Sequence, residues 1–382
     1  MGEMTRRERL TATLAGRPVD RPAFSFYEIG GLAMDADDPD PFNIHSDPSW
    51  RPLLELAERE TDLIRMCYPG KKPAEGNCRE EFFKERTYEE GGSRFVRTAL
   101  TVGGRTLTSL ERRNRDVDTI WHVEHLLKDA DDVEAYLQLP DEVLDYEPDV
   151  APLKQAEEAL GDRGIVMVDT ADPLCAAASL FDMETYLIIA MTERTLFHKL
   201  LDKLARPALE FTRKLSSAFG GHLWRICGPE YAGEPYLPPA LFDEYVVRYA
   251  APMVHAIQAH GGYARIHMHG RIRSALPLLA KMRPDGLDPI EPPPLGDVQL
   301  AEVRRDYGRD MVLFGNLETR DIDGMPPDQF EKVVARALRE GTGGEGRGFV
   351  LMPSACPVGR RISAATMQNY RTVARMAAAF RG

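Results

Sequence analysis

The sequence predicts an α/β protein built as a TIM-type (β/α)8 barrel, and two observations carry that prediction. After residue 150, short apolar runs of strand length alternate with amphipathic helical segments as far as the C-terminus. Polar residues of the types used in catalysis and metal binding lie at or just after the ends of these runs. Repeated strand–helix units form parallel sheets, and so many in one chain favour a closed barrel with its active site at the carboxyl ends of the strands.

The alternating part is expected to contain six of the strands and most of the helices. The strands are predicted over 164–169, 222–227, 263–267, 286–290, 311–316 and 348–352. The helices are predicted over 152–160, much of 183–217, 239–260, 271–282, 298–307, 327–340 and about 363–380.

The first 150 residues are predicted to form an N-terminal helical and β-hairpin elaboration of a single domain, 1–382. Helices are expected over 4–16, 51–60 and from 130 to before Pro140, with a first strand over 22–27. Residues 93–102 and 105–110 alternate in hydropathy and flank Gly103-Gly104. Such a glycine pair favours a tight antiparallel turn, so we interpret 80–125 as a hairpin insertion.

Composition narrows the possible partners. The net charge is −12 with no basic, aromatic-rich patch, which argues against nucleic acid. No apolar run is long enough to span a bilayer, so no membrane is expected. The chain opens on polar residues without an apolar signal segment, and its five cysteines show no CxxC spacing. We therefore expect a cytoplasmic protein with reduced thiols and a small-molecule substrate.

The most informative stretch is the sequence around His267 and His269. Glu291 and Cys356 follow later strand-like runs, so a barrel would bring all four side chains to one mouth. Two imidazoles, a carboxylate and a thiolate are a competent ligand set for one zinc ion. The two histidines share a face if their strand continues to residue 269, because alternate residues point the same way. The alternative is that both merely form hydrogen bonds at a strand end.

Further candidates stand at other predicted strand ends. Glu230 and Asp169 are interpreted as general acid/base groups or substrate anchors, with a structural carboxylate as the alternative. Asn316 either hydrogen-bonds substrate or satisfies loop backbone.

Substrate-contacting residues are expected at Tyr27, Glu28 and Arg271, with a surface or loop role as the alternative for each. Cys227 is a possible second thiolate, although such a cysteine is more often a small buried apolar residue.

Several segments together resemble the uroporphyrinogen decarboxylase-like superfamily, and the resemblance covers nearly the whole chain. They are residues 4–10 with 14–22, 228–231 with Pro238, 267–270, 291–297, 315–317, and Cys356 with Asn369-Tyr370. The resemblance implies a TIM-type barrel and one of two chemistries. One is cofactor-free decarboxylation; the other is zinc-dependent methyl transfer to a thiol, often from a methylated corrinoid carried by a partner protein.

The methyltransferase branch is the preferred interpretation. Its His-x-Cys…Cys zinc motif is matched by His267 and approximately by Cys356, and Glu291 stands at an interval like that of cobalamin-independent methionine synthase. His269 replaces the first cysteine, which makes the site harder and favours oxygen substrates more than a thiolate site would. A homodimer is common among such relatives.

Two alternatives stay open beside methyl transfer. A cofactor-free decarboxylase, or a metal-dependent lyase or hydrolase, is the second function that the resemblance allows. The decarboxylases carry an early arginine-containing segment that grips substrate carboxylates, whereas this chain has Ser25-Phe26-Tyr27-Glu28 there. A non-catalytic binding protein on the same barrel is a third possibility.

Overall fold

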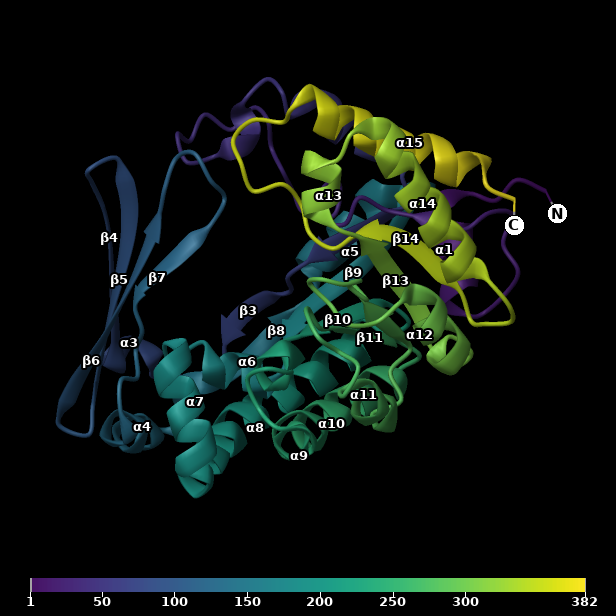
Figure 1. Cartoon of the computed structure of the whole chain (residues 1–382). Coiled ribbons are helices and arrows are strands. Elements are labelled where there is room, and N and C mark those ends of the chain that lie inside the picture. Colours follow the sequence, from purple (N-terminus) through teal and green to yellow (C-terminus); the bar gives the residue numbers. More distant parts are fainter. Residues whose placement is uncertain (1, 382) are drawn as a thin grey trace.

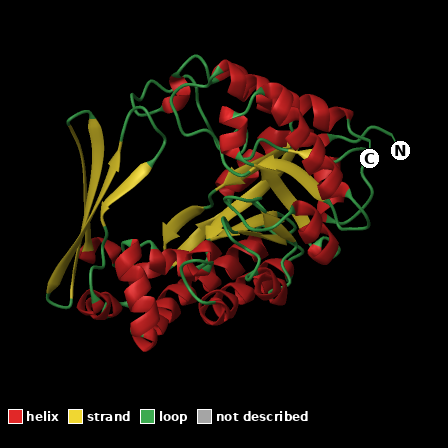
Figure 2. Ribbon diagram, viewed as in Figure 1, coloured by secondary structure: helices red, strands yellow, loops and turns green. Residues whose placement is uncertain are grey.

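The computed structural model describes residues 2–381 and confirms the predicted barrel fold. Eight parallel strands form one curled sheet in the order β1-β14-β13-β12-β11-β10-β9-β2. They are β1 (Ala23–Phe24), β2 (Leu63–Cys67), β9 (Gly164–Ala171), β10 (Leu223–Cys227), β11 (Tyr263–His267), β12 (Gly286–Asp288), β13 (Val312–Leu317) and β14 (Phe349–Pro353). The helices surround this sheet (Figures 1 and 2).

The two outer strands of this order, β1 and β2, meet and close the barrel. The Asp62 backbone N–H donates to the Phe24 carbonyl at 2.8 Å, and the Phe24 N–H donates to the Asp62 carboxylate at 2.9 Å. Farther along, the Met66 N–H donates to the Gly31 carbonyl at 2.8 Å. Since all strands run the same way, their carboxyl ends share one mouth.

The helices agree with the predicted alternation. Their bounds are α1 (Arg6–Leu14), α2 (Arg51–Glu60), α3 (Arg79–Phe82), α4 (Ala130–Leu137), α5 (Ala151–Leu160), α6 (Pro173–Ala178), α7 (Met183–Thr192), α8 (Arg194–Ala218), α9 (Pro239–Phe242), α10 (Arg248–Gln258), α11 (Leu276–Lys281), α12 (Leu300–Tyr307), α13 (Thr319–Gly324), α14 (Pro327–Thr342) and α15 (Ala364–Ala379). No helix among residues 2–381 is both long and apolar enough to cross a membrane.

A separate antiparallel sheet lies between β2 and β9 in the sequence and projects away from the barrel (Figure 1). Its strands, in spatial order, are β4 (Phe83–Glu90), β5 (Ser93–Val102), β6 (Arg105–Arg113) and β7 (Ile120–Glu124). The expected turn at Gly103-Gly104 joins β5 to β6, and both glycines have positive φ. A short antiparallel pair, β3 (Gly70–Pro73) with β8 (Tyr146–Asp149), forms a third sheet.

Three expectations about the strands and helices were wrong in detail. The strand β2 was not predicted, because Arg65 interrupts its apolar run; its guanidinium pairs with Glu58 at 2.6 Å. The strand expected over 286–290 stops at Asp288, because Pro289 has no N–H to continue the ladder. The helix expected from residue 271 begins at Leu276 instead.

Candidate functional site

Two histidines lie in contact at the mouth of the barrel. His267 is the last residue of β11 and is 5% exposed, while His269 lies just beyond the strand. The strand therefore ends before residue 269, so the two histidines do not share a strand face as expected. The following turn nevertheless brings the rings together, with centroids 4.6 Å apart and planes at 88°.

Each imidazole is oriented by its own carboxylate. His267 Nδ1 lies 2.7 Å from Asp288 Oδ2, at the end of the neighbouring strand β12. His269 Nδ1 lies 2.9 Å from Glu291 Oε1, and the other oxygen of Glu291 accepts the Gly270 N–H at 2.6 Å. Within residues 2–381 neither Nε2 atom is hydrogen-bonded, so both remain available. A carboxylate on one ring nitrogen is the usual arrangement around a metal-binding histidine.

The surroundings of these pairs favour the charged forms of Asp288, His269 and Glu291. Burial opposes ionisation of Asp288, but Arg265 and His267 outweigh it and hold its pKa below the ordinary value. Burial likewise opposes the charged form of His269, yet the hydrogen bond to Glu291 and the nearby carboxylates raise its pKa. The pKa of Glu291 is lowered against burial by the same contact with His269.

Two ion pairs with buried aspartates lie next to the histidines. Arg265, which is fully buried, contacts Asp288 at 2.8 Å. Asp169 accepts from Arg225 Nη2 at 3.1 Å, and Arg225 also donates to the Tyr27 hydroxyl. The Tyr27 ring stacks on His267 at 6.0 Å. Asp169 thus lies inside β9 as the partner of an arginine, which is the structural alternative considered for it.

The cysteine expected to join the histidines has other partners. The Cys356 N–H donates to Glu28 at 3.1 Å, and its Sγ contacts the Pro357 carbonyl at 3.5 Å. Burial and the charge of Glu28 raise the pKa of the Cys356 thiol. Among the described residues, no three His, Cys, Asp or Glu side chains are arranged to hold a metal ion. The structure thus brings His267, His269 and Glu291 into contact, and joins Cys356 to Glu28.

The remaining predicted residues lie around the same rim. Glu230 is in the 3-10 turn Pro229–Ala232 after β10, and its carboxylate accepts the Gly228 N–H at 3.2 Å. Asn316 is 8% exposed within β13. Arg271 is exposed beyond the histidines.

Five largely buried charged residues were missed by the sequence interpretation: Arg225, Arg265, Asp288, Asp172 and Glu318. Asp288 directly precedes a proline at a strand end, and Glu318 directly follows Asn316-Leu317 at another. Both positions could have been singled out by the strand-end argument used for Glu291. The two arginines lie within apolar strand runs, and only the fold shows that they face the interior.

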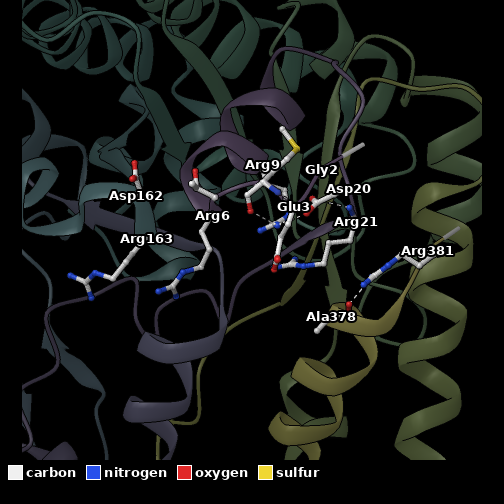
Figure 3. Close-up of a pocket in the computed structure, with 12 residues that line it drawn as sticks. Gly2, Glu3, Arg6, Arg9, Asp20, Arg21, Asp162, Arg163, Ala378 and Arg381 are labelled. Carbon is white, nitrogen blue, oxygen red and sulfur yellow. Dashed lines mark hydrogen bonds and ion pairs between the residues drawn. The ribbon is translucent and has the colours of Figure 1, made fainter.

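One large cavity lies away from this mouth. It has a volume of about 800 Å³ and lies at the amino ends of the strands, with Arg6, Arg9, Arg21 and Arg163 on its wall (Figure 3). A cavity of about 460 Å³ lies on the opposite side, beside the carboxyl ends of β9 and β10. Asp169 and Cys227 line the second cavity together with Tyr68, Phe211 and Trp224.

The comparisons with known proteins agree with this architecture. Residues 118–368 match the family described as "Uroporphyrinogen decarboxylase (URO-D)", which is more than half of the chain, so the protein belongs to that family. A search of curated proteins found no match.

Similarity to solved structures extends over the full length. The fold resembles a "methyltransferase from Methanosarcina mazei" with a TM-score of 0.58 and 15% identity, covering 98% of this chain and 99% of that one. A D-psicose 3-epimerase matches with a TM-score of 0.32 and 10% identity over 64% of this chain and 84% of its own, too distant to inform function.

Proposed function

We propose that this protein is an enzyme that transfers a methyl group from a methylated corrinoid or other methyl donor to a thiol-type acceptor. The observation that carries the proposal is the His267–His269 pair at the barrel mouth, with each Nδ1 held by a carboxylate and each Nε2 without a hydrogen bond among residues 2–381. The full-length similarity to a methyltransferase supports it. A partner protein would deliver the corrinoid, and a homodimer remains part of the proposal.

The proposed cofactor is zinc, with His267, His269, Glu291 and Cys356 as its ligands. The two imidazoles fit this role because their Nδ1 atoms are already oriented. Glu291 would have to release its present partners, and Cys356 would have to lose a proton that burial favours keeping. Zinc bound there would keep a thiol acceptor deprotonated at neutral pH.

Around that centre, the chain's own groups would position the acceptor. Glu230 lies at the rim near His269 and adds negative charge to it, so it is a candidate to accept a proton from the incoming acceptor. Asn316, Tyr27, Glu28 and Arg271 remain candidates for contacting substrate.

Decarboxylation of a substrate with many carboxylates is less well supported. Such a substrate needs cationic partners, whereas Arg225 and Arg265 are each committed to a buried aspartate. Their charges are therefore compensated before any substrate arrives.

The test combines metal content with a methyl-transfer assay. Wild-type protein should contain about one equivalent of zinc, and the His267→Ala and Cys356→Ala variants should lose it. Methylcobalamin and a panel of small thiols should yield the methyl thioether with the wild type but not with either ligand variant. The control is His255→Ala, an exposed histidine of α10, which should keep both metal and activity. Unchanged zinc in both ligand variants would reject these ligands.

A further inference from the structure

The cavity of about 460 Å³ between α8 and the carboxyl ends of β9 and β10 has a largely apolar wall. Leu204, Phe211 and Leu215 of α8 form one side of it. Val168 and Trp224 of the barrel strands form another. Pockets that bind small organic molecules have volumes in this range and combine an apolar wall with a few polar groups. The cavity is therefore suited to the apolar part of a ligand.

One part of this cavity reaches the face of the sheet that carries His267. Cys227 lines the cavity and is in register with His267 on the adjacent strand β11. Residues in register on neighbouring strands point to the same face of a sheet. Asp169 also lines the cavity and accepts from Arg225 at 3.1 Å. Arg225 in turn donates to Tyr27, whose ring stacks on His267. A molecule in the cavity can thus place one end beside the histidine pair.

The charged groups on the cavity wall leave one cation without a partner. The carboxylate of Asp169 is already paired with an arginine. Lys71 is exposed, its ammonium lies 5.6 Å from the centroid of the Phe211 ring, and it has no carboxylate partner among residues 2–381. Its sequence neighbour Lys72, by contrast, contacts Asp149 at 3.0 Å and does not line the cavity. An unpaired cation at the rim of an apolar cavity suits a ligand with an acidic group.

We propose that this cavity is a binding site for a small organic acid with an apolar body about the size of one aromatic ring. The acidic group pairs with Lys71 at the exposed rim, and the body packs against Phe211 and Trp224. Tyr68, which is 63% exposed at the cavity, offers a further aromatic face to the body. The end remote from the acidic group lies toward His267, so the ligand is a substrate. The site stands on the cavity alone, whereas the role as substrate rests on the proposed function.

The test is a calorimetric titration of the full chain with para-toluate and with its neutral counterpart para-toluamide. Wild-type protein should bind the acid about fivefold more tightly than the amide, because an exposed ion pair contributes up to about that much. Lys71→Met keeps the aliphatic stem of the side chain and should remove the preference for the acid. Lys72→Met is the matched control and should keep both wild-type affinities, since Lys72 lies outside the cavity wall.

A second variant tests the apolar body. Ala208 of α8 lines the cavity, so Ala208→Phe places a ring in the space that the ligand needs. It should weaken binding of both probes by about tenfold or more and leave the thermal unfolding temperature unchanged. Wild-type protein that binds no para-toluate, or binding that neither Lys71→Met nor Ala208→Phe weakens, would overturn the site.

The role as substrate has its own readout. In the methyl-transfer assay, para-toluate should inhibit the wild type by competing with the thiol, and the inhibition should be weaker in Lys71→Met. Tight binding of para-toluate without inhibition would overturn the role as substrate and leave both the site and the proposed function standing. Wild-type protein that binds para-toluate as expected but transfers no methyl group would overturn the proposed function and keep the site.

Discussion

The two ends of the barrel differ in how completely their buried carboxylates are paired. At the amino ends of the strands, Asp62 is fully buried and contacts Arg9 at 2.6 Å and Arg21 at 2.8 Å, and Asp20 contacts Arg9 as well. At the carboxyl ends, Asp169 and Asp288 also contact arginines, but Asp172 and Glu318 each bury an oxygen that has no hydrogen-bond partner among residues 2–381. The cavity of about 800 Å³ lies at the fully paired end (Figure 3).

We interpret the paired carboxylates as part of the structure of the fold. The unpaired carboxylates are candidates for binding a ligand. A network in which each carboxylate oxygen meets an arginine or a backbone N–H is complete without substrate. Unpaired buried carboxylates make the apo fold less stable and are expected where a cation, a proton or a substrate arrives. The cavity of about 800 Å³ therefore lies away from the candidate site.

The largest expected effect comes from neutralising Asp172. Its Oδ1 caps α6 by accepting the Cys175 N–H at 2.6 Å, and burial raises its pKa from 3.8 to about 8. The folded state therefore holds this proton longer than the unfolded state, and stability decreases as the pH rises from about 4 to about 8. Asp172→Asn keeps the cap and should be more stable than wild type at pH 9, by up to roughly 5 kcal/mol.

The measurement is urea unfolding of both proteins at pH 5, 7 and 9. The advantage of the Asn variant should grow with pH and be smallest at pH 5. An advantage that is the same at all three pH values would contradict a proton on Asp172 as its cause.

The second prediction disturbs the paired end. Asp62→Ala leaves Arg9 and Arg21 without their shared partner and removes the acceptor of the Phe24 N–H that helps to close the barrel. Breaking a buried pair from one side typically destabilises by roughly 3–5 kcal/mol. Asp37→Ala is the control, since Asp37 and Arg51 form an exposed pair whose loss should change the stability far less. Equal stability changes in the two variants, measured by urea unfolding, would contradict a special role for the buried network.

The contrast between the ends also explains how much could be predicted from sequence. The alternation of strands and helices after residue 150 is a local pattern, so the barrel and the convergence of His267, His269 and Glu291 followed from it. The partners that define the site are not local. The contacts of Asp288 with Arg265, and of Cys356 with Glu28, depend on strand register and side-chain direction.

Two misses have the same physical origin. The strand β2 was overlooked because Arg65 breaks its apolar run, although the arginine is accommodated by Glu58 from the preceding helix. Arg225 was overlooked because it lies in an apolar strand, and its acceptability there depends on Asp169 in the adjacent strand. A charged residue in a buried strand can be interpreted only when its partner is known.

The smallest effect on stability is expected for Tyr27→Phe. This variant tests whether Asp169 is a sufficient hydrogen-bond partner for Arg225. The variant removes the hydroxyl that accepts from Arg225 but keeps the ring stacked on His267. Losing a hydrogen bond to a charged group should reduce stability by about 2 kcal/mol, because Arg225 retains its aspartate. Zinc affinity should be unchanged, since the His267 Nδ1 contact with Asp288 is untouched. Thermal unfolding and a titration with zinc test these two expectations. A variant of normal stability that loses metal would place the Tyr27 hydroxyl at the ligand site instead of in the network with Arg225 and Asp169.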